Sequence, residues 1–427
     1  MSLAAKLAEF ALNTAPDQTA SDAQAVMRLS LYDWMVCGLV GAHEPVAQIV
    51  RSVAPDGGAH AVFGSEDTFG PAQAAWINGT TSHALDYDDT HFDHIGHPSV
   101  AVFPAAFAMG ANGADTLRAA LIGAELSVRI GAWLGRGHYE AGFHQTATAG
   151  AFGATCAAGR LLGLTQPQLQ AALGVAATQA AGLKSQFGTM GKPYHAGLAA
   201  RTGVEAALLA QAGFDTRGAG LDGPQGFGPT HYGAGDLSAF EGLGSHWRMT
   251  DVRHKFHACC HGLHAMLEAL EQCDLPAPSD LDAIDVTTHP RWLRVCNIDA
   301  PKTGLETKFS YRHVAAMVVH GVPTAALDGY SDTHAQDVTL QKTRAKVRVH
   351  ADADLAETEA HVRVSAGNDV IERRYDVSAP VTLTDKTDRL RRKGRALLGP
   401  QTEELLWTAC IRDSGPNMDA LTDLMVF

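Results

Sequence analysis

The sequence lacks the features that mark several large classes of protein. Basic residues are few: 33 Lys and Arg stand against 46 Asp and Glu, and the formal net charge is −13. Because nucleic-acid-binding proteins concentrate Lys and Arg on one face, we expect no nucleic-acid partner. No uninterrupted apolar run is long enough to span a membrane, and the first residues do not resemble a secretory signal. We therefore expect no membrane association.

Cysteine is scarce, and its arrangement does not suggest a disulfide framework. The seven cysteines are odd in number, form no Cys-x-x-Cys motif and include the adjacent pair Cys259 and Cys260. Reduced thiols fit this arrangement better than disulfide bonds, which favours a cytoplasmic location.

Aromatic residues are also sparse, at 7%, whereas glycine (43 residues) and alanine are abundant. Such a composition favours helices that approach closely over small side chains, rather than a β-sandwich. A chain of 427 residues is long enough for about two domains.

The order of helical and strand-like patterns predicts how these domains are arranged. Apolar residues follow helical spacing through most of the first 250 residues, and one such helix, PAQAAWINGTTSHAL, begins at Pro71. From Asp251 a new helix, VRHKFHACCHGLHAMLEALEQC, precedes the alternating strand patterns LDAIDVTTHP, AKVRVHAD, AHVRVSAG and NDVIERRYDV. Helical spacing returns from Thr384. We predict a mainly α protein: a large helical domain (residues 1–250 and 380–427) with a smaller inserted α+β domain (251–379).

One stretch, Asn78 to Ser99 (NGTTSHALDYDDTHFDHIGHPS), concentrates ionisable groups. Its members are Asp86, Asp88, Asp89, Asp93, His83, His91, His94 and His97. Enclosed carboxylates are costly unless they are paired, so such a cluster indicates acid–base chemistry or a metal site. A solvated, inert surface loop is the alternative.

Two groups of histidines have spacings that a metal site could use. His91, His94 and His97 follow one another at three-residue intervals beside aspartates, and His257, His261 and His264 would share one face of a helix. Neither group matches a motif such as HExxH, and the motifs GxSxG and GxxxxGK[ST] are missing too. Structural histidines are the alternative for the second group.

Lysines and histidines elsewhere in the chain complete a different candidate site. Lys192 and Lys255 can hold the carboxylates of an anionic substrate, and His97 and His144 can exchange protons near neutral pH. With Asp86 and Thr90, they suggest proton transfer at a carbon next to a carboxylate.

These motifs together resemble the MmgE/PrpD family of 2-methylcitrate dehydratases, cis-aconitate decarboxylases and iminodisuccinate epimerases. The similar blocks are NGTTSHALDYDDTH…HPSVAVFPAAFA, GFHQTATAGAFGATCAAGRLLGL, GTMGKPYHAGLAARTGVEAALLAQAGF, KFHACCHGLHAMLEAL and KFSYRHVAAM. The resemblance implies a helical domain, an α+β lid domain and a homodimer. It also implies chemistry on small di- or tricarboxylates in a cleft between the domains, without a metal or cofactor.

The resemblance also assigns the site residues. The family's polar residues fall on Asp86, Thr90, His97, His144, Lys192 and Lys255, and a position that is commonly tyrosine in the decarboxylases is His313 here, with Tyr311 two residues earlier. We expect Asp86, His97, His144 and His313 to be catalytic, and Thr90, Lys192 and Lys255 to bind substrate.

The leading hypothesis is a metal-independent dehydratase (hydro-lyase) that acts on a hydroxylated polycarboxylate of the 2-methylcitrate kind. In it, His97, oriented by Asp86, is the main proton-transfer group, and His144 or His313 protonates the leaving hydroxyl. An epimerase of an iminodisuccinate-like substrate comes second, with His97 and His313 as the acid–base pair, and a cis-aconitate decarboxylase comes third. A metallohydrolase and a non-catalytic binding protein are the alternatives from other classes.

Overall fold

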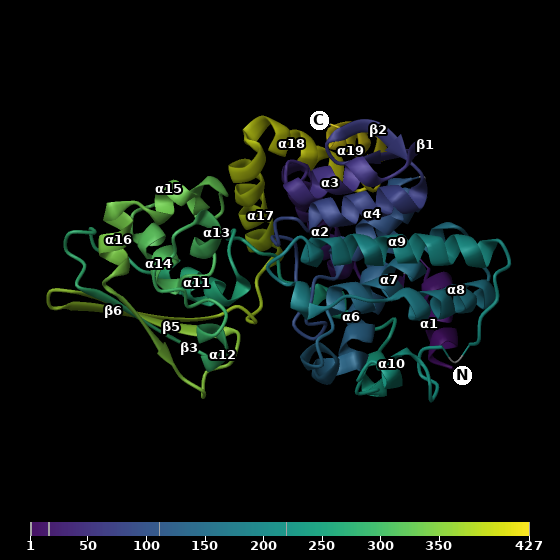
Figure 1. Ribbon diagram of the computed structural model, residues 1–427, viewed down its shortest axis with the longest axis horizontal. Helices are drawn as coiled ribbons and strands as arrows, with labels where there is room; N and C mark the ends of the chain where they lie inside the picture. Colours follow the sequence, from purple (N-terminus) through teal and green to yellow (C-terminus); the bar gives the residue numbers. More distant parts are fainter. Residues whose placement is uncertain (1, 16–17, 111, 219, 427) are drawn as a thin grey trace. The chain divides into compact units, whose positions relative to one another are not determined.

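The structure is a computed structural model that describes residues 2–15, 18–110, 112–218 and 220–426. The chain divides into two compact units. We call Met1–His254 with Leu398–Phe427 the helical unit, and Lys255–Leu397 the α+β unit. Each is described by itself, with the element labels of Figure 1.

The helical unit consists almost entirely of helices, with one two-stranded antiparallel ribbon, β1–β2. Its elements are α1 (Leu3–Asn13), α2 (Ser21–Gly41), α3 (Pro45–Val53), β1 (Asp56–Val62), β2 (Ser65–Phe69), α4 (Pro71–Ser82), α5 (Ser99–Met109), α6 (Gly113–Glu140), α7 (Gln145–Leu161), η2 (Lys184–Gln186), α8 (Gln166–Gln179), α9 (Gly191–Gln211), α10 (Phe227–Thr230), η3 (Leu237–Phe240), η4 (Arg248–Asp251), α18 (Pro400–Cys410) and α19 (Met418–Met425).

Helix α7 lies at the centre of this unit. It packs against α5, α6 and α9, and α9 packs in turn against α4; Figure 1 shows α6, α7 and α9 side by side. All residues of α7 from Gln145 to Gly159 are buried, and most are alanine, glycine or threonine. The abundance of small residues therefore does what the composition predicted: it allows helices to surround a helix on several sides.

The contact between α4 and α9 is the closest of these approaches. A Cβ atom added to Gly197 of α9 would lie 2.3 Å from the carbonyl oxygen of Trp76 and 2.1 Å from Thr80 Oγ1, both on α4. Likewise, a Cβ added to Gly79 would lie 2.8 Å from the Cα of Gly197. Only glycine fits at this crossing, and the crossing fixes the helix that leads into the polar stretch.

Helix α4 ends where the ionisable residues begin. It starts with Pro71 in its first turn, as the sequence predicted, and its last residue is Ser82, with His83 as the C-cap. The connection to α5 includes a bridge between His91 and Gly96, and another between Thr90 and Arg253. These bridges hold the polar stretch as an ordered loop rather than a solvated tether.

The last two helices of the chain belong to the helical unit. Helix α18 packs against α2 and α19, and α19 also packs against α2 and β1. Tyr32 of α2 donates a hydrogen bond to the buried Glu403 of α18 (3.2 Å). Segments nearly 400 residues apart in the chain thus share one core.

The α+β unit contains a four-stranded sheet with the strand order β4-β3-β5-β6. The β3–β4 pair is parallel, and the other two pairs are antiparallel. Its elements are η5 (His261–Leu263), α11 (His264–Glu271), β3 (Ala283–Thr288), α12 (Pro290–Leu293), α13 (Gly304–Thr307), α14 (Tyr311–Val319), η6 (Asp328–Tyr330), α15 (Asp332–Ala335), α16 (Val338–Arg344), β4 (Val347–Ala351), β5 (Glu359–Ala366), β6 (Asp369–Asp376) and α17 (Leu383–Leu398).

Helices cover this sheet and bury its apolar residues. Helix α11 packs against β5 and β6, and α14 packs against α11, α16 and β4. The alternating patterns correctly located all four strands, and Gly367-Asn368 forms the two-residue turn between β5 and β6, with Gly367 at a positive φ of 57°. The chain is therefore largely helical with a small sheet in its C-terminal part.

The helix expected from residue 252 onward does not form until His264. Before it, the backbone N–H of Ala258 donates to the carbonyl of Thr324, and that of Cys260 donates to the carbonyl of Lys308. Because these N–H groups donate to neighbouring loops, they cannot form the hydrogen bonds that a helix requires. His257 consequently precedes the helix, and the expected helical face of His257, His261 and His264 is wrong.

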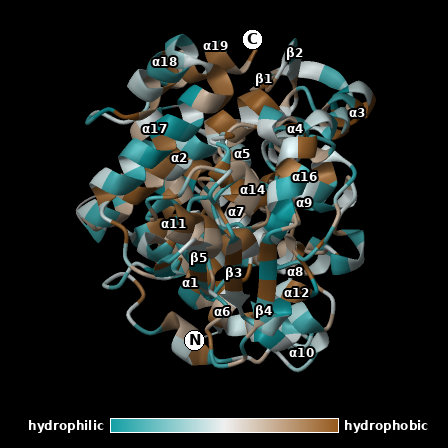
Figure 2. Ribbon diagram, turned by 90° about the vertical axis from the view of Figure 1, so that its left-hand side faces the viewer, coloured by the Kyte–Doolittle hydropathy of each residue, from teal (hydrophilic) through white to brown (hydrophobic). Residues whose placement is uncertain are grey.

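Helix α17 groups with the α+β unit, whereas the sequence analysis drew the domain boundary before it, at residue 379. Arg389 of α17 pairs with Glu268 of α11 and lies 3.9 Å over the ring of Phe256. This helix has mainly hydrophilic colours in Figure 2, so charged contacts of this kind account for its attachment.

Over the described residues, no single helix is long and apolar enough to cross a membrane. Helices α2 and α3 reach the required length and composition only as a pair, with a bend of 84° between them.

The crossing of α4 and α9 yields a stability prediction. Gly197→Ala should destabilise the protein by about 1–3 kcal/mol, because the added methyl forces the two helices apart. Thermal unfolding measures the change. The matched control is Gly137→Ala in α6, where the nearest atom would be 3.4 Å away; this variant should be neutral or more stable by up to about 1 kcal/mol. Equal melting temperatures for the two variants would contradict the packing argument.

Candidate active site

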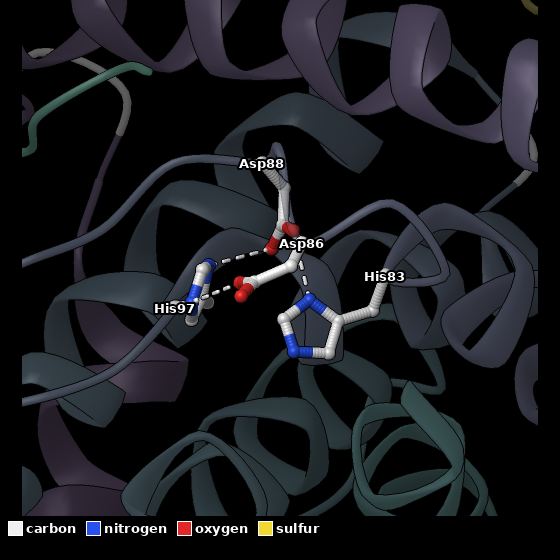
Figure 3. A group of neighbouring side chains, drawn as sticks. All are labelled: His83, Asp86, Asp88 and His97. Carbon is white, nitrogen blue, oxygen red and sulfur yellow. Dashed lines mark hydrogen bonds and ion pairs between the residues drawn. The ribbon is translucent and has the colours of Figure 1, made fainter. Parts of the chain in front are cut away.

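The polar stretch forms a continuous chain of ionisable side chains in the helical unit (Figure 3). His83 Nδ1 lies 2.8 Å from Asp88 Oδ1, and Asp88 Oδ2 lies 3.0 Å from His97 Nδ1. His97 Nε2 then lies 3.2 Å from Asp86 Oδ1, and the same oxygen is 2.6 Å from Lys192 Nζ. Imidazole, carboxylate and ammonium groups thus alternate along the chain.

This row of ionisable side chains runs from the interior of the protein towards solvent. The side chains of Asp88 and His97 are 2% and 8% exposed, whereas that of Asp86 is 42% exposed. Asp86 and Lys192, whose side chains are 42% and 15% exposed, therefore form the more exposed end of the cluster.

Asp86 has an unusual backbone conformation. Its φ is 51°, in the left-handed region that few residues other than glycine adopt, although aspartate is among the more tolerant. Its N–H donates to the carbonyl of His83 in a turn (3.1 Å). This turn directs the carboxylates of Asp86 and Asp88 to opposite nitrogens of His97. Strained backbone of this kind is concentrated at functional sites.

His97 is held as a proton-rich imidazole. Burial by itself lowers its pKa, but the charge of Asp88 and hydrogen bonds to Asp86 and Asp88 outweigh burial and raise the pKa above its ordinary value. The imidazolium form is therefore favoured, and His97 can act as a proton donor.

Burial alone would raise the pKa of Asp88, but His83 and His97 reverse the shift and hold the pKa well below its usual range. Burial lowers the pKa of His83 to about 4, despite the opposing effect of Asp88. Near neutral pH, Asp88 is thus an ionised acceptor and His83 is a neutral donor.

His144 is the counterpart of His97 in charge. It is the N-cap residue of α7, and its Nδ1 lies 3.2 Å from Nδ1 of His195 on α9. Burial, followed by the positive charge of Lys192, holds its pKa well below the ordinary value. His144 is therefore a neutral imidazole that can accept a proton, close to an imidazolium that can donate one.

Lys192 reaches the cluster from the first turn of α9. Its Nζ also lies 5.4 Å from the centre of the Phe187 ring. The N-terminal end of a helix favours anions, so a lysine here adds to a location already suited to a carboxylate.

Thr90 and Asp89 brace the loop. Thr90 and Arg253 exchange backbone hydrogen bonds of 2.7 Å, and Thr90 Oγ1 donates to the carbonyl of Arg253 (3.3 Å). Asp89 accepts a 2.5 Å hydrogen bond from Ser99 Oγ, and its burial raises its pKa to about 6. Substrate binding by Thr90 stays a prediction.

Two expected site residues, Lys255 and His313, belong to the α+β unit. Lys255 is 3% exposed, and His313 is fully buried on α14. Both ring nitrogens of His313 lack a hydrogen-bond partner among the described residues, and burial lowers its pKa to about 4. Tyr311 is engaged elsewhere: its hydroxyl donates to the carbonyl of Gly262 (2.6 Å).

The four side chains of Figure 3 have atoms of the ligand type within 4.8 Å of one another. The ammonium of Lys192, however, already lies 2.6 Å from Asp86, and the two carboxylates raise the pKa of His97 and so favour a proton on its ring. A metal requires a deprotonated imidazole and would have to displace both. Of the other imidazoles considered for a metal, His91 Nε2 instead lies 3.0 Å from the carbonyl of Arg248.

Three members of the cluster were not selected from the sequence: His83, Asp88 and His195. The spacing of His195, three residues after Lys192, places both on one side of α9 and was a usable signal. Asp88 faces His97 because of the left-handed turn at Asp86. Sequence spacing does not reveal this turn, so it gave no reason to choose Asp88.

With the site in place, comparison with known proteins identifies the class. The MmgE/PrpD N-terminal domain matches residues 5–239, and the MmgE/PrpD C-terminal domain matches residues 257–404. The chain belongs to the MmgE/PrpD family, which confirms the resemblance read from its motifs.

The similar curated proteins are named cis-aconitate decarboxylases. That of Aspergillus terreus (strain NIH 2624 / FGSC A1156) is 32% identical over 306 residues, which cover 66% of this chain and 62% of the relative. The Homo sapiens protein is 34% identical over 167 residues, which cover 37% of this chain and 34% of the relative. The chain thus spans about three fifths of the length of the fungal relative.

Buried neutral histidines yield a prediction about stability and pH. The pKa is about 4 for His83 and His138, about 3 for His94 and well below normal for His144. In the unfolded chain each would titrate near 6.5. As the pH falls from about 6.5 to 4, the unfolded chain takes up protons that the folded chain refuses, so stability falls, by up to about 1.4 kcal/mol per pH unit for each group.

Asp89, with a pKa of about 6, opposes this trend, because its protonation below pH 6 favours the folded chain. His97, whose pKa is raised, also gains stability on acidification, but only down to about pH 6.5. Below that pH the four histidines, joined by His313 with a pKa of about 4, act against Asp89, so calorimetry between about pH 6.5 and 4.5 should show a falling melting temperature. A melting temperature that stays constant or rises on acidification would contradict the assignment of neutral histidines.

Proposed function

We propose that this protein is a lyase that acts on a small hydroxylated di- or tricarboxylate by proton transfer at the carbon next to a carboxylate. The observation that carries the proposal is the pairing of a proton-rich His97 with a proton-poor His144 beside Lys192. When neighbouring groups have pKa values pushed in opposite directions, the arrangement defines an acid and a base.

The pKa directions favour a particular division of labour in water elimination. His144 removes the proton from the carbon next to the carboxylate, the electron pair forms the new double bond, and the C–O bond breaks as His97 gives its proton to the leaving hydroxyl. From the sequence, His144 or His313 was expected to be the donor. The reversal follows because burial and positive neighbours disfavour a proton on His144, whereas two carboxylates favour one on His97.

Lys192 supplies the carboxylate contact in this proposal. Its ammonium is a compact positive charge at the accessible end of the cluster, where it also stabilises negative charge that develops during proton removal. Asp86 holds that ammonium and the Nε2 face of His97 through one oxygen (2.6 and 3.2 Å). A substrate carboxylate that reaches Lys192 therefore lies beside the proton donor.

Decarboxylation of a cis-aconitate-like substrate is the second candidate, because the relatives carry that name. It requires a proton donor for the carbanion left after loss of CO2, and His97 can fill that role alone. The epimerase hypothesis needs acid–base groups on both faces of one carbon, and here His97 and His144 form the available pair. Catalysis by His313 and substrate binding by Lys255 remain predictions.

One assay with several substrates tests the proposal. The purified protein is incubated in deuterated buffer with 2-methylcitrate, citrate, cis-aconitate and an iminodisuccinate, and proton NMR follows the products. A new alkene from a hydroxylated substrate is the expected result for a hydro-lyase. Loss of CO2 from cis-aconitate identifies the decarboxylase, and deuterium incorporation with inversion identifies the epimerase.

The same assay includes two controls. Activity should persist after chelation with EDTA, since Lys192 and the proton on His97 balance the charges of the cluster. His97→Gln and His144→Gln should each lose activity by about 10²–10⁴-fold, the usual contribution of a general acid or base. If the folded protein turns over none of these polycarboxylates, the proposed substrate class is wrong.

Lys192 generates a separate prediction about binding and pH. Lys192→Met should lower kcat/KM by about 10²–10³-fold, since the charge that holds and stabilises the anion is lost. The positive charge of Lys192 also lowers the pKa of His144, so the pH profile of the base should move to higher pH in this variant. Lys342→Met removes an exposed lysine of α16 and should leave both quantities unchanged. An unaltered kcat/KM in Lys192→Met would exclude this lysine from the site.

A further inference from the structure

The least accessible part of the cluster contains two residues that need not touch a substrate, His83 and Asp88. Asp88 is 2% exposed and His83 is 1% exposed. A buried carboxylate is costly unless both oxygens have partners. Oδ1 of Asp88 forms a hydrogen bond with His83 Nδ1 (2.8 Å), whereas Oδ2 lies 3.0 Å from His97 Nδ1 as an ion pair whose angles fall outside hydrogen-bond geometry (Figure 3).

We propose that Asp88, fixed by His83, is a positioning residue for His97: it anchors the Nδ1 side of that ring and presents Nε2 to Asp86 and the substrate. This assignment rests on the proposed role of His97 as the proton donor. The contact with Asp88 would explain why the His97 ring has one orientation and one reactive nitrogen.

The tautomers follow from the acceptor between the two rings. An ionised Asp88 only accepts hydrogen bonds, so Nδ1 of His83, which bonds to it, must carry hydrogen. The negative charge of Asp88 Oδ2, 3.0 Å from Nδ1 of His97, favours hydrogen on that nitrogen as well. With a hydrogen fixed at Nδ1, the exchangeable proton of His97 is the one at Nε2, on the side of Asp86 and Lys192. His83 then keeps its Nε2 unprotonated, and this atom is buried with no hydrogen-bond partner among the described residues.

His83 suits the role of a fixed donor because it does not compete for the proton. Burial favours its neutral form and keeps its pKa at about 4. It therefore donates to Asp88 over the working pH range without charging itself. A lysine or arginine in its place would neutralise Asp88 and weaken the hold of Asp88 on the His97 proton.

Other charges near His97 also affect its pKa, and they limit how far Asp88 alone can raise it. The titratable groups around His97, from its own loop and from α4, α7 and α9, are Asp86, Asp88, Asp89, His83, His94, His144 and Lys192. Lys192 and the histidines disfavour the imidazolium, so the carboxylates must outweigh them. Of these carboxylates, Asp86 shares its oxygen with Lys192, whereas Asp88 directs one oxygen at His97 alone.

The test measures His97 directly in the full-length protein. Selective ¹⁵N-histidine labelling and long-range ¹H–¹⁵N correlation give the pKa and the tautomer, and His97→Gln identifies the resonances. Asp88→Asn keeps the volume of the side chain and can still accept from His83, but it removes the charge. We expect the pKa of His97 to fall by about 1–3 units, with loss of the fixed Nδ1–H state.

Matched variants separate positioning from general damage. Asp93→Asn removes an exposed carboxylate from the same loop, and it should leave the His97 pKa unchanged. His83→Asn retains a donor for Asp88 and should preserve most of the wild-type behaviour, whereas His83→Leu removes the donor and should not. If Asp88→Asn does not fold, the comparison of His83→Asn with His83→Leu carries the test.

Kinetics provide the second readout. Asp88→Asn should lower kcat by about 10–100-fold with little change in KM, and it should move the acidic limb of the pH profile with the His97 pKa. A His97 pKa and tautomer that are the same in Asp88→Asn as in the wild type would overturn the proposal, as would a lowered pKa with unchanged kcat. Because the NMR result needs no substrate, it stands even if the proposed substrate class fails.

Discussion

The burial of Asp88 between two imidazoles is the constraint on which the rest of the site depends. A charged carboxylate inside a protein is costly unless it is paired, and here His83 Nδ1 bonds to one oxygen at 2.8 Å while His97 Nδ1 lies 3.0 Å from the other as an ion pair. His83 is in place because α4 ends one residue before it, and α4 is fixed by its close crossing with α9. The same α9 carries Lys192. One pair of packed helices therefore sets both the buried and the accessible end of the cluster.

Opposite electrostatic surroundings give chemically identical side chains different functions. His97 faces two carboxylates and retains a proton, whereas His144 faces positive neighbours in a buried position and does not. Histidine suits both roles, because its ordinary pKa lies near neutrality and modest changes of environment move it either way. The density of histidine in this part of the sequence is thus meaningful, because the proposed acid, base and fixed donor are all imidazoles in different surroundings.

Sequence patterns predicted those parts of the protein that local chemistry determines. Pro71 marked the start of α4, and β-branched alternation located the strands. The helix expected from residue 252 failed because loops far away in the chain take up the N–H groups of Ala258 and Cys260. Within the site, the selection of Asp86, His97, His144 and Lys192 rested on residue chemistry and family resemblance. Asp88 was passed over because its orientation depends on a backbone turn at Asp86 that no spacing rule reveals.

The shared core of α18 and α19 with α2 has a consequence for the order of folding during synthesis. A ribosome makes residues 398–427 only after the whole α+β unit, so the first 254 residues emerge without the helices that complete their core. The hydrogen bond from Tyr32 to Glu403 can form only after α18 has been synthesised. The α+β unit, whose residues are continuous in the chain, has no such delay. The core of the helical unit can therefore be completed only after the whole α+β unit has been synthesised.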